Sequence, residues 1–427
     1  MSAVTLALVG AGLRGQAYAR LAVGTGQARV VAVAEPDPGR RAAAAAEFGI
    51  DPEFVFDSWS GLVAQPRLAG LNGEPRLADA AIVATQDRMH RDPAVALADL
   101  GYHLLIEKPL APTEEDAAAI VDAAVRNKVI AAVCHVMRYT PYTRLVKGLL
   151  DAGRIGKLVS VQHLEPVGWW HFAHSFVRGN WRNTAESGPL LLTKCCHDID
   201  WLVHLFGQLP ERISSFGSLS HFKPSERPEG AADRCLDCSV ESTCPYSAKR
   251  RYEQALADPD DHFWPLGAVT PIATEESLRT ALREGPYGRC VYACDNDVVD
   301  HQVVNLAFAD GATCSFTVSA FTPMEHRRTR LQGTRGYLDG DGRYVTLLDF
   351  VTGETEVFDS DESAGASAAD GHGGGDEGLT KAFIAAVATG DPSLLPSDPV
   401  ESLATHRVVW AAEQARRNDE IVHFQTM

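Results

Sequence analysis

The sequence lacks the features that would place the chain in a membrane or on nucleic acid. No uninterrupted apolar run among its 427 residues approaches the roughly 18 residues that cross a bilayer. Basic residues are outnumbered, with 39 Lys and Arg against 56 Asp and Glu. The resulting net charge of −17 repels phosphate backbones and anionic lipid headgroups. We therefore expect a soluble protein with no nucleic-acid partner and no membrane partner.

Cysteine is also scarce, and the N-terminus has little likeness to a signal peptide. Nine cysteines in 427 residues fall well short of the roughly 8–10% of a disulfide scaffold, and an odd number cannot all pair within one chain. The N-terminus has no basic segment ahead of its first apolar stretch, which reaches glycine at residue 10. This pattern argues against a signal peptide. Together these features predict a cytoplasmic protein whose cysteines are mostly thiols.

What is present is the composition of a globular protein, with 45% hydrophobic and 22% charged residues. A chain of this length holds two or three domains at about 100–200 residues each. In its first part, short apolar runs alternate with helix-compatible segments, and the runs span residues 4–9, 29–34, 80–85, 103–108 and 129–136. Continuous apolar strands between helices predict a doubly wound α/β domain over residues 1–135, with helices on both faces of a parallel sheet.

A glycine-rich turn follows the first of these strands. The segment Gly10-Ala11-Gly12-Leu13-Arg14-Gly15 separates the strand from a helix, and Glu35 ends the second strand 20 residues beyond Gly15. In a dinucleotide site the first two glycines let the backbone approach the pyrophosphate, the third permits close helix packing, and the acid binds the ribose hydroxyls. Because every offset agrees, the pattern predicts a dinucleotide-binding Rossmann domain rather than a purely structural turn.

The same residues favour one nicotinamide cofactor. A carboxylate at Glu35 disfavours the 2′-phosphate of NADP, so NAD is expected, and the nearby Arg40 keeps NADP open. Ligands of such sheets bind beyond the carboxyl ends of the strands. The residues expected to contact the cofactor are Gly10, Gly12, Leu13, Arg14, Gly15, Glu35, Thr85, His90, Glu107, Lys108 and Arg138.

Beyond residue 155 the pattern changes to strands of period two. These runs lie at residues 158–165, 212–220, 298–309, 312–321, 327–334 and 344–350. They predict an α+β domain over residues 136–427 with an open-faced, mainly antiparallel sheet. Two helices are expected to close the chain, one after Asp376 and one after Asp398-Pro399, with Asp398 as the N-cap.

Three segments resemble one family. They are Glu107-Lys108-Pro109 at a strand end, VMRYTPYTRLVKGLLDAGRIGKLVSV from residue 136, and GPLLLTKCCHDIDWLVHLFG from residue 188. They are similar to motifs of the Gfo/Idh/MocA oxidoreductases, the glucose–fructose oxidoreductase and inositol dehydrogenase family. The resemblance implies an NAD(P)-dependent dehydrogenase that acts on a CH–OH group of a sugar, inositol or related polyol. It also implies a homo-oligomer, and an open sheet face that either roofs the active site or forms a dimer interface.

The resemblance also implies catalytic residues. The family residue that matches Lys108 lies near the nicotinamide and the substrate hydroxyl, and the Lys-Pro bond after it is often cis. A lysine there can hydrogen-bond the reacting oxygen, and a positive nicotinamide lowers its pKa toward the acid–base range. The other interpretation of Lys108 is a lysine that caps the strand end.

The family's Asp-x-x-x-His pair is changed in this chain, because Thr193 stands at the aspartate position. Lys194 and His197 are three residues apart and are expected on one face of a helix. We assign His197 as the general base for the substrate hydroxyl and Lys194 as the residue that positions or polarises it. The other interpretation of His197 is a histidine satisfied within the core.

The net reaction stays open at this point. A side branch of the family with Lys-x-x-His includes NAD-dependent glycosidases, which oxidise a sugar transiently, eliminate the aglycone, add water and return the hydride. Both reactions begin with hydride abstraction from a carbinol carbon. A third possibility is a non-catalytic, nucleotide-sensing protein, against which the intact Lys108 and His197 argue.

Two further segments have alternative interpretations. Residues 167–183 carry aromatic side chains that either line a carbohydrate pocket or belong to the core, namely Trp169, Trp170, His171, His174 and Trp181. An insertion at about 222–297 contains Cys235-x2-Cys238-x5-Cys244 and Cys290-x3-Cys294. Three or four of these thiolates, with Cys290 as the fourth, form a candidate structural zinc site that would staple a polar loop. The alternative is a set of buried free thiols.

Overall fold

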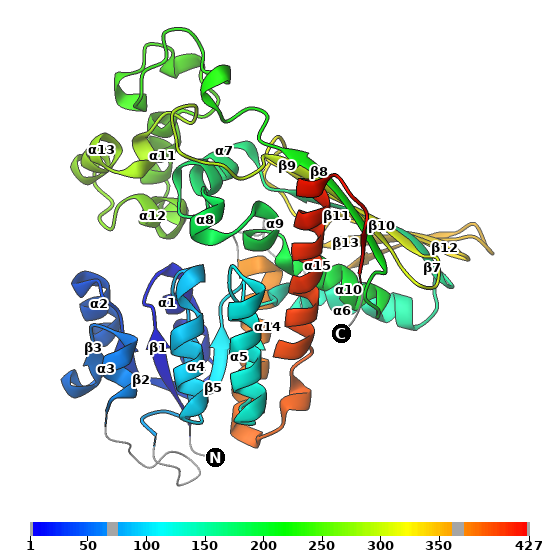
Figure 1. The fold of residues 1–427 in the computed structure, drawn as a ribbon, viewed down its shortest axis with the longest axis horizontal. Helices are drawn as coiled ribbons and strands as arrows, with labels where there is room; N and C mark the ends of the chain where they lie inside the picture. The colour runs from blue at the N-terminus through cyan, green and yellow to red at the C-terminus, as the bar shows by residue number, and fades with distance from the viewer. Residues whose placement is uncertain (1–2, 66–75, 361–370, 425–427) are drawn as a thin grey trace.

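The computed structural model describes residues 3–65, 76–360 and 371–424, and it contains two sheets (Figure 1). The first sheet has six parallel strands in the order β3-β2-β1-β4-β5-β6. Chain order reverses between β1 and β4, which creates the crevice where such sheets bind ligands. The strands are β1 (Val4–Val9), β2 (Ala28–Ala34), β3 (Val55–Phe56), β4 (Ala80–Val83), β5 (His103–Ile106) and β6 (Ala131–Val133). The predicted doubly wound sheet is therefore confirmed.

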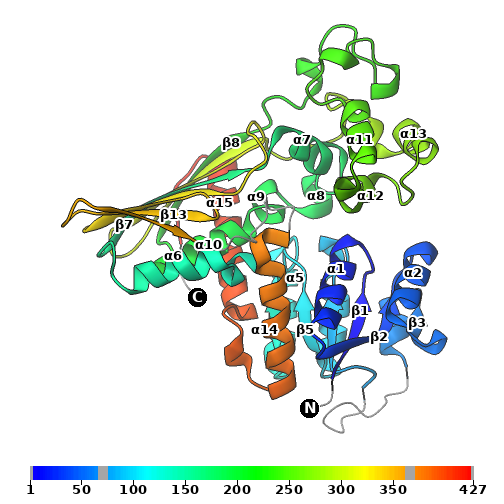
Figure 2. The ribbon, with the colours of Figure 1, turned by 180° about the vertical axis from the view of Figure 1, so that it is seen from behind.

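Helices cover both faces of this sheet. One face carries α1 (Leu13–Gly24) and α2 (Pro38–Phe48), and the other carries α3 (Trp59–Val63), α4 (Arg91–Asp99) and α5 (Glu114–Arg126). A helix from the far end of the chain, α14 (Gly375–Thr389), packs beside α1, as Figures 1 and 2 show. Its Leu379, Phe383 and Ile384 share one core with strands β1 and β4. The predicted boundary at residue 135 thus separates the two sheets, but the first layered unit is completed by α14.

The second sheet has nine strands in the order β14-β13-β12-β11-β7-β10-β9-β8-β15. All neighbouring pairs are antiparallel except β7 with β10, so the prediction of a mainly antiparallel sheet is confirmed. The strands are β7 (Leu158–Pro166), β8 (Arg212–Ser218), β9 (His301–Ala307), β10 (Thr313–Ser319), β11 (Arg328–Gly333), β12 (Gly336–Gly340), β13 (Tyr344–Asp349), β14 (Thr355–Asp359) and β15 (Val422–His423). Strands β12, β14 and β15 were not predicted, because each is short or rich in charge and glycine.

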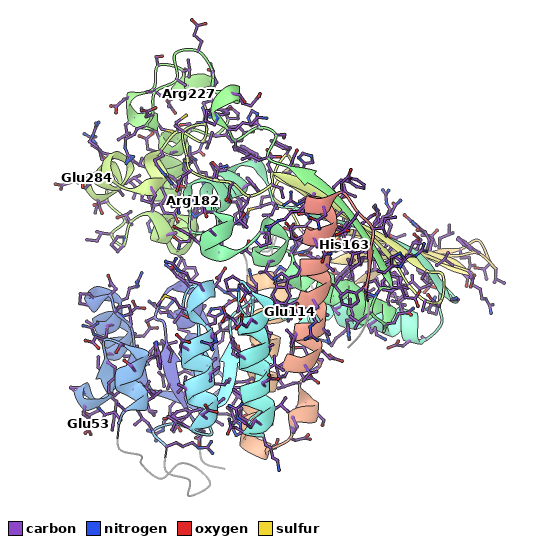
Figure 3. The ribbon with its side chains drawn as sticks, viewed as in Figure 1. Glu53, Glu114, His163, Arg182, Arg227 and Glu284 are labelled. Carbon is purple, nitrogen blue, oxygen red and sulfur yellow. The ribbon has the colours of Figure 1, made fainter. Side chains whose placement is uncertain are left out.

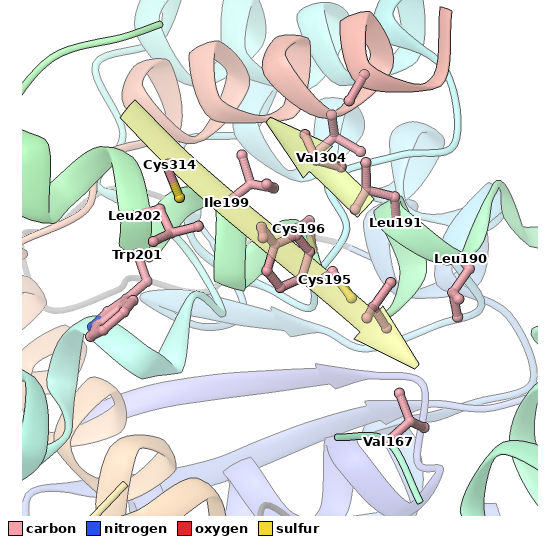
Figure 4. Packing of buried hydrophobic residues seen from close by; sticks show 14 of the residues in the cluster. Val167, Leu190, Leu191, Cys195, Cys196, Ile199, Trp201, Leu202, Val304 and Cys314 are labelled. Carbon is pink, nitrogen blue, oxygen red and sulfur yellow. The ribbon is translucent and has the colours of Figure 1, made fainter. Parts of the chain in front are cut away.

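One face of the second sheet is covered by helices. These are α6 (Pro141–Asp151), α10 (Cys196–Phe206) and α15 (Pro399–Asn418). Leu202 of α10 lies beside Cys314 of the sheet (Figure 4), and the ring centre of Trp201 lies 5.0 Å from that of His163 on β7. The opposite face is open, and its apolar residues meet across strands, since Phe216 pairs with Val303 and Val303 with Thr317. The two sides of the sheet are thus chemically distinct.

The insertion at 222–297 folds around its own small core. It carries α11 (Ala248–Ala257), α12 (Gly267–Val269) and α13 (Glu275–Glu284). Its buried apolar residues are Cys235, Ala248, Tyr252, Ala255, Leu266, Leu278 and Leu282. The cysteines are therefore not the only residues that hold the described part of the insertion together. Within the described ranges, no helix is long and apolar enough to pass through a bilayer.

Helix α15 begins as the sequence predicts. Oδ1 of Asp398 accepts a hydrogen bond from the backbone N of Glu401 at 2.8 Å, and Pro399 occupies the first helical position. Side-chain capping satisfies one of the backbone donors that a helix start leaves open.

We predict that Asp398→Ala lowers the free energy of unfolding by about 1 kcal/mol, because the capping acceptor is lost. Denaturant unfolding followed by circular dichroism measures this change. Asp398→Ser keeps a capping oxygen and is expected to stay close to the wild type. An equal loss in both variants would show that the cap is not the cause.

Candidate active site

The glycine turn after β1 contains two glycines that the protein itself requires. Gly10 has φ +90°, and a Cβ there would lie 2.5 Å from the carbonyl oxygen of Ala84. A Cβ at Gly15 would lie 2.0 Å from the carbonyl oxygen of Gly10. Gly12 differs, since its φ is −72° and a Cβ would meet no described atom within 4 Å. Open space at Gly12, directly before the N-terminus of α1, fits a pyrophosphate.

Two side chains beside the turn also fit a dinucleotide. Glu35 is buried at the end of β2, where its Oε2 accepts from the backbone N of Ala11 at 2.8 Å. Its Oε1 lies 3.0 Å from the guanidinium of Arg40. This ion pair neutralises Arg40, the residue that had kept NADP open as the cofactor. At the end of β4, the buried Thr85 hydroxyl has no hydrogen-bond partner in the described parts of the chain. An unpartnered hydroxyl at the crevice is available to a bound cofactor.

Arg14 and Glu107, both expected to contact the cofactor, bind each other. Nε of Arg14 lies 2.7 Å from Oε1 of Glu107, and its Nη2 lies 2.6 Å from Oδ1 of Asp376 on α14. The other oxygen of Glu107 accepts from the backbone N of Lys108 at 2.7 Å. Burial raises the pKa of Glu107, but the charges of Arg14 and Lys108 prevail and hold it below its usual value. These contacts fix the glycine turn relative to Lys108.

Two other expected cofactor residues make structural contacts. Arg138 donates two hydrogen bonds to Asp200, at 2.7 and 2.8 Å, and one to Glu401 at 2.8 Å. Its guanidinium thus ties α10 to α15, and we leave Arg138 out of the cofactor set. His90 contacts the carbonyl oxygens of Pro109 at 2.9 Å and Thr85 at 3.1 Å. It fastens the loop after β5 to the end of β4.

Lys108 extends from the first sheet toward the second domain. The Lys108-Pro109 peptide bond is cis, and Nζ of Lys108 donates to the carbonyl oxygen of Thr193 at 2.6 Å. The same ammonium lies 5.9 Å from the ring centre of Trp181. Nε1 of Trp181 donates to Oδ2 of Asp87 at 3.1 Å, and burial raises the pKa of this carboxyl, which the nearby charges of His90 and Lys108 oppose. Lys108, Trp181 and Asp87 therefore lie side by side.

Lys194 and His197 do not share one helix, contrary to the prediction. Helix α9 (Leu190–Thr193) ends before Lys194, and α10 starts at Cys196, because Cys195 adopts the non-helical angles φ −115° and ψ 7°. His197 lies in the first turn of α10 and is 2% exposed. The two side chains are instead connected through residues of the second sheet.

That connection is a buried charge cluster on the covered face of the sheet. Nζ of Lys194 lies 3.1 Å from Oε1 of Glu165, and Oε2 of Glu165 lies 2.6 Å from Nε of Arg327. Arg327 also binds Oδ1 of Asp198 at 2.8 Å and Nε2 of His197 at 2.9 Å. Burial raises the pKa of Asp198, but the Arg327 charge holds it well below its usual value. We call Lys194, Glu165, Arg327, Asp198 and His197 the charge cluster.

His163 closes the cluster from the sheet side. Its Nε2 lies 3.1 Å from Oδ1 of Asp198, and its Nδ1 lies 2.7 Å from the hydroxyl of Thr329, its partner residue across β7 and β11. His163 thus lies between the sheet and α10, and Figure 3 labels its position. Because the cluster lies on the covered face, the open face of the sheet does not roof the site, which corrects one of the two expectations for that face.

Some of the aromatic side chains of residues 167–183 pack against the insertion, and one lies beside Lys108. Trp170 packs on Trp264 with ring centres 5.2 Å apart, and His174 donates to or accepts from the hydroxyl of Tyr252 at 2.7 Å. Both residues therefore pack against side chains of the insertion. Trp181 is the one of the five predicted aromatics that contacts Lys108. His171 has a pKa well below its usual value, mainly through burial and then through the charge of Lys194.

The insertion reaches the cofactor turn. A Cβ at Gly267 of α12 would lie 3.7 Å from Cδ2 of Leu13, the first residue of α1. Leu13 was expected to contact the cofactor, and the structure places it under the insertion. Helix α12 of the insertion thus lies above the N-terminal end of α1 in the view of Figure 1.

The cysteine groups of the insertion come together in space. The backbone N of Cys290 donates to the carbonyl oxygen of Asp233 at 2.8 Å, and Cys235, Cys238, Cys244 and Cys290 border one cavity. Burial raises the pKa of the Cys244 and Cys290 thiols. No group of three or more His, Cys, Asp or Glu side chains is placed to hold a metal ion in the chain as described. The zinc prediction is therefore not supported by the present side-chain arrangement.

The first domain is a parallel sheet with a glycine turn at its switch point. The second domain is a large sheet that faces a lysine of the first. Together they define a dinucleotide-dependent enzyme of two domains. Residues 4–135 match the family model of the NAD-binding Rossmann fold of the oxidoreductase family GFO_IDH_MocA, and residues 147–424 match its C-terminal alpha/beta domain. The chain belongs to the Gfo/Idh/MocA oxidoreductases, as the resemblance implied.

Individual relatives agree with this assignment. The chain is 27% identical to "Putative oxidoreductase YteT" of Bacillus subtilis over 310 residues, 70% of each chain. It is 31% identical to inositol 2-dehydrogenase 2 of Saccharopolyspora erythraea over 208 residues, 48% of this chain and 54% of the relative. It is 27% identical to 2,7-anhydro-N-acetylneuraminate hydratase of Escherichia coli over 210 residues, 49% and 53% of the two chains. The match thus spans about half the length of the last two relatives.

Solved structures share the fold over the whole chain. Levoglucosan dehydrogenase in complex with NADH and levoglucosan superposes with a TM-score of 0.68 at 16% identity and covers 100% of both chains. An oxidoreductase from Agrobacterium radiobacter in complex with NAD+, L-tartaric acid and magnesium gives a TM-score of 0.69 at 15% identity, covering 99% of this chain and 98% of that one.

Four site residues were missed in the sequence. Asp87, Glu165, Asp198 and Arg327 were not singled out, although each is buried and charged. The sequence did contain a signal for Glu165. This charged residue stands at a position of strand β7 where the alternation of polar and apolar residues calls for an apolar side chain. Asp198 and Arg327 carry no such signal, since their pairing depends on how α10 packs on the sheet.

Gly12 and Gly15 of the turn give a matched test of cofactor binding. We predict that Gly12→Ala leaves the free energy of unfolding nearly unchanged but weakens NAD binding by about tenfold, equal to about 1.4 kcal/mol, because the methyl group enters the pyrophosphate space. Gly15→Ala is expected to lower stability, since its Cβ would collide with Gly10. Calorimetric titration and thermal unfolding measure both. Unchanged NAD affinity in Gly12→Ala would contradict the assigned pyrophosphate position.

Proposed function

We propose that the protein is an NAD-dependent dehydrogenase that transfers hydride between nicotinamide and a carbinol carbon of a neutral sugar, cyclitol or related polyol. The observation that carries this proposal is the hydrogen bond from Lys108 to Thr193, which brings the lysine to the helix ends that precede His197, beside the ring of Trp181. The net charge of −17 favours a neutral substrate over a sugar phosphate. NADP is the second cofactor to test.

Each residue of the site has its own role in the proposed reaction. Bound NAD supplies the carbon that accepts the hydride. Gly12 and the N-terminus of α1 hold the pyrophosphate, and Glu35 binds the adenosine ribose. Lys108 hydrogen-bonds the reacting oxygen and exchanges its proton, and His197 contacts the same oxygen from α10. The ring of Trp181 offers an apolar plane to the C–H face of a sugar.

Substrate class is tested with a panel of sugars, inositols, anhydrosugars and glycosides, each with NAD and with NADP, followed at the absorbance of the reduced cofactor. A response confined to one class fixes substrate and cofactor together. Absence of cofactor reduction with every polyol would contradict the proposal.

Substitution of Lys108 gives the most direct test of its acid–base role. We predict that Lys108→Met lowers kcat by about 100-fold or more, the usual effect of removing an acid–base group, while NAD affinity changes little. Lys147→Met is the control, because Lys147 is a surface residue paired with Asp151. Steady-state rates and NAD titrations separate the two effects. Parallel losses of rate and NAD affinity would indicate a binding role instead.

A second candidate keeps the same first step but is redox-neutral overall. Thr193 replaces the family aspartate, and a relative is named a hydratase of an anhydrosugar. In such a reaction the hydride returns to the substrate after elimination or addition. Nitrophenyl glycosides and anhydrosugars are therefore incubated with enzyme and NAD. Product formation without accumulation of NADH favours this candidate over the dehydrogenase.

We also propose that the open sheet face forms an interface between copies of the chain. Phe216 is 60% exposed on β8, next to the edge strand β15, and pairs in register with Val303 of β9. We predict that light scattering on the wild type gives a multiple of the 46.1 kDa chain mass, and that Phe216→Glu lowers it. Ile272→Glu, on an equally exposed apolar residue of the insertion, is the control. A wild type that is monomeric would contradict the interface.

A further inference from the structure

Arg327 determines which nitrogen of His197 carries the proton. Nη2 of Arg327 lies 2.9 Å from Nε2 of His197. A guanidinium has only donors, so the imidazole nitrogen that faces it must present its lone pair. We propose that Arg327 is a positioning residue that holds His197 as the neutral Nδ1-protonated tautomer, so that His197 acts as a hydrogen-bond donor and not as the general base. This inference rests on the proposed function for its catalytic meaning.

The opposite tautomer is excluded by the neighbouring carboxylate. A proton on Nε2 would need Asp198 as acceptor, but the distance from Nε2 to Oδ2 of Asp198 is 3.6 Å. Both oxygens of Asp198 already accept from Arg327, at 2.8 and 3.3 Å, and Oδ1 also lies 3.1 Å from Nε2 of His163. A proton on Nε2 of His197 would therefore face a second donor at 2.9 Å without a hydrogen bond of its own.

The charge balance excludes the imidazolium form. Strand β7 contributes Glu165 and His163 to the surroundings, α10 contributes Asp198, the end of α9 contributes Lys194, and Arg327 precedes β11. Two carboxylates thus meet two cations, and the sum is zero when both histidines are neutral. A proton added to His197 would place a positive charge against Arg327 in a site that is 2% exposed. Like charges at such burial disfavour protonation.

The inference changes the assignment of the proton acceptor. Because the lone pair of His197 is held by Arg327, the hydroxyl proton of a carbinol goes to Nζ of Lys108 in its amine form, which becomes an ammonium. Bound NAD would take the hydride from the same carbon, so that the carbinol would become a carbonyl. His197 donates from Nδ1 to the oxygen it meets, which stabilises the charge that develops there. The general-base role first assigned to His197 thus passes to Lys108.

Nitrogen NMR tests the tautomer without any substrate. Protein with ¹⁵N-labelled histidine and saturating NAD is recorded in long-range ¹H–¹⁵N correlation spectra from pH 6 to 8, and His197→Gln identifies the signals of His197. The expected result is one tautomer throughout, with Nδ1 protonated and Nε2 bare. A proton on Nε2, or two protons at pH 7, overturns the inference. Failure of the dehydrogenase assay alone leaves this readout intact and concerns only the proposed function.

Variants test the positioning role. Arg327→Met is expected to release His197 toward the carboxylates of Glu165 and Asp198, which raise its pKa, so that kcat/KM gains an ionisation above about 6.5 that the wild type lacks. Arg327→Lys keeps a cationic donor and is expected to retain the wild-type pH profile. Arg328→Met, which removes the adjacent exposed arginine, is the control. An Arg327→Met profile without a new ionisation overturns the role, and if that variant does not fold, the wild-type NMR spectrum decides.

Discussion

The site depends on the pairing of Arg327 with the two carboxylates Glu165 and Asp198. Charges buried between a sheet and a helix are costly, and they are tolerated only when each meets an opposite charge at hydrogen-bond distance. Removing one member of such a group costs about 3–5 kcal/mol, because the remaining charge is left in a medium that does not solvate it. This pairing connects β7, the segment before β11 and the first turn of α10, so it also sets the direction of the His197 ring.

A second set of contacts joins the two sheets. Lys108 binds the end of α9, and Arg138 binds both Asp200 of α10 and Glu401 of α15. Each is a charged or hydrogen-bonded contact between groups that are distant in the chain. Since a hydride transfer needs its reacting carbons within about 3–3.5 Å, the relative placement of the sheets is part of the chemistry. The helices that return from the C-terminal part provide that placement.

Much of this architecture could be predicted from sequence, because local rules determine it. The glycine turn, the longer strands of both sheets and the capped start of α15 follow from steric and periodic patterns that act over a few residues. The family and the catalytic segments were recognisable from short motifs. Predictions failed where long-range packing decides, as with the broken helix between Thr193 and Cys196. The partners of Arg138 and Arg327 were likewise unpredictable, because a charged residue in a strand end reveals nothing about which helix will cover it.

The insertion shows a similar limit. Its polar composition and cysteine spacing suggested a metal-held loop, whereas Tyr252, Leu266 and Leu278 form an apolar core of its own. Hydrophobic residues scattered over some fifty positions give no periodic signal, yet three short helices can bring them together. The two cysteine groups also meet around one cavity despite their separation in sequence, because the backbone of Cys290 pairs with that of Asp233.

The position of α14 has a consequence for biosynthesis. This helix covers one face of the nucleotide-binding sheet, but it is made only after every strand of the second sheet except β15. While the chain leaves the ribosome, the apolar surface beneath α14 stays uncovered until translation is nearly complete. Domains usually fold as they emerge, and the first half of this chain must wait for its last helices instead. A premature stop codon before α14 would therefore leave one apolar face of the first sheet uncovered, even though every strand of that sheet had already been translated.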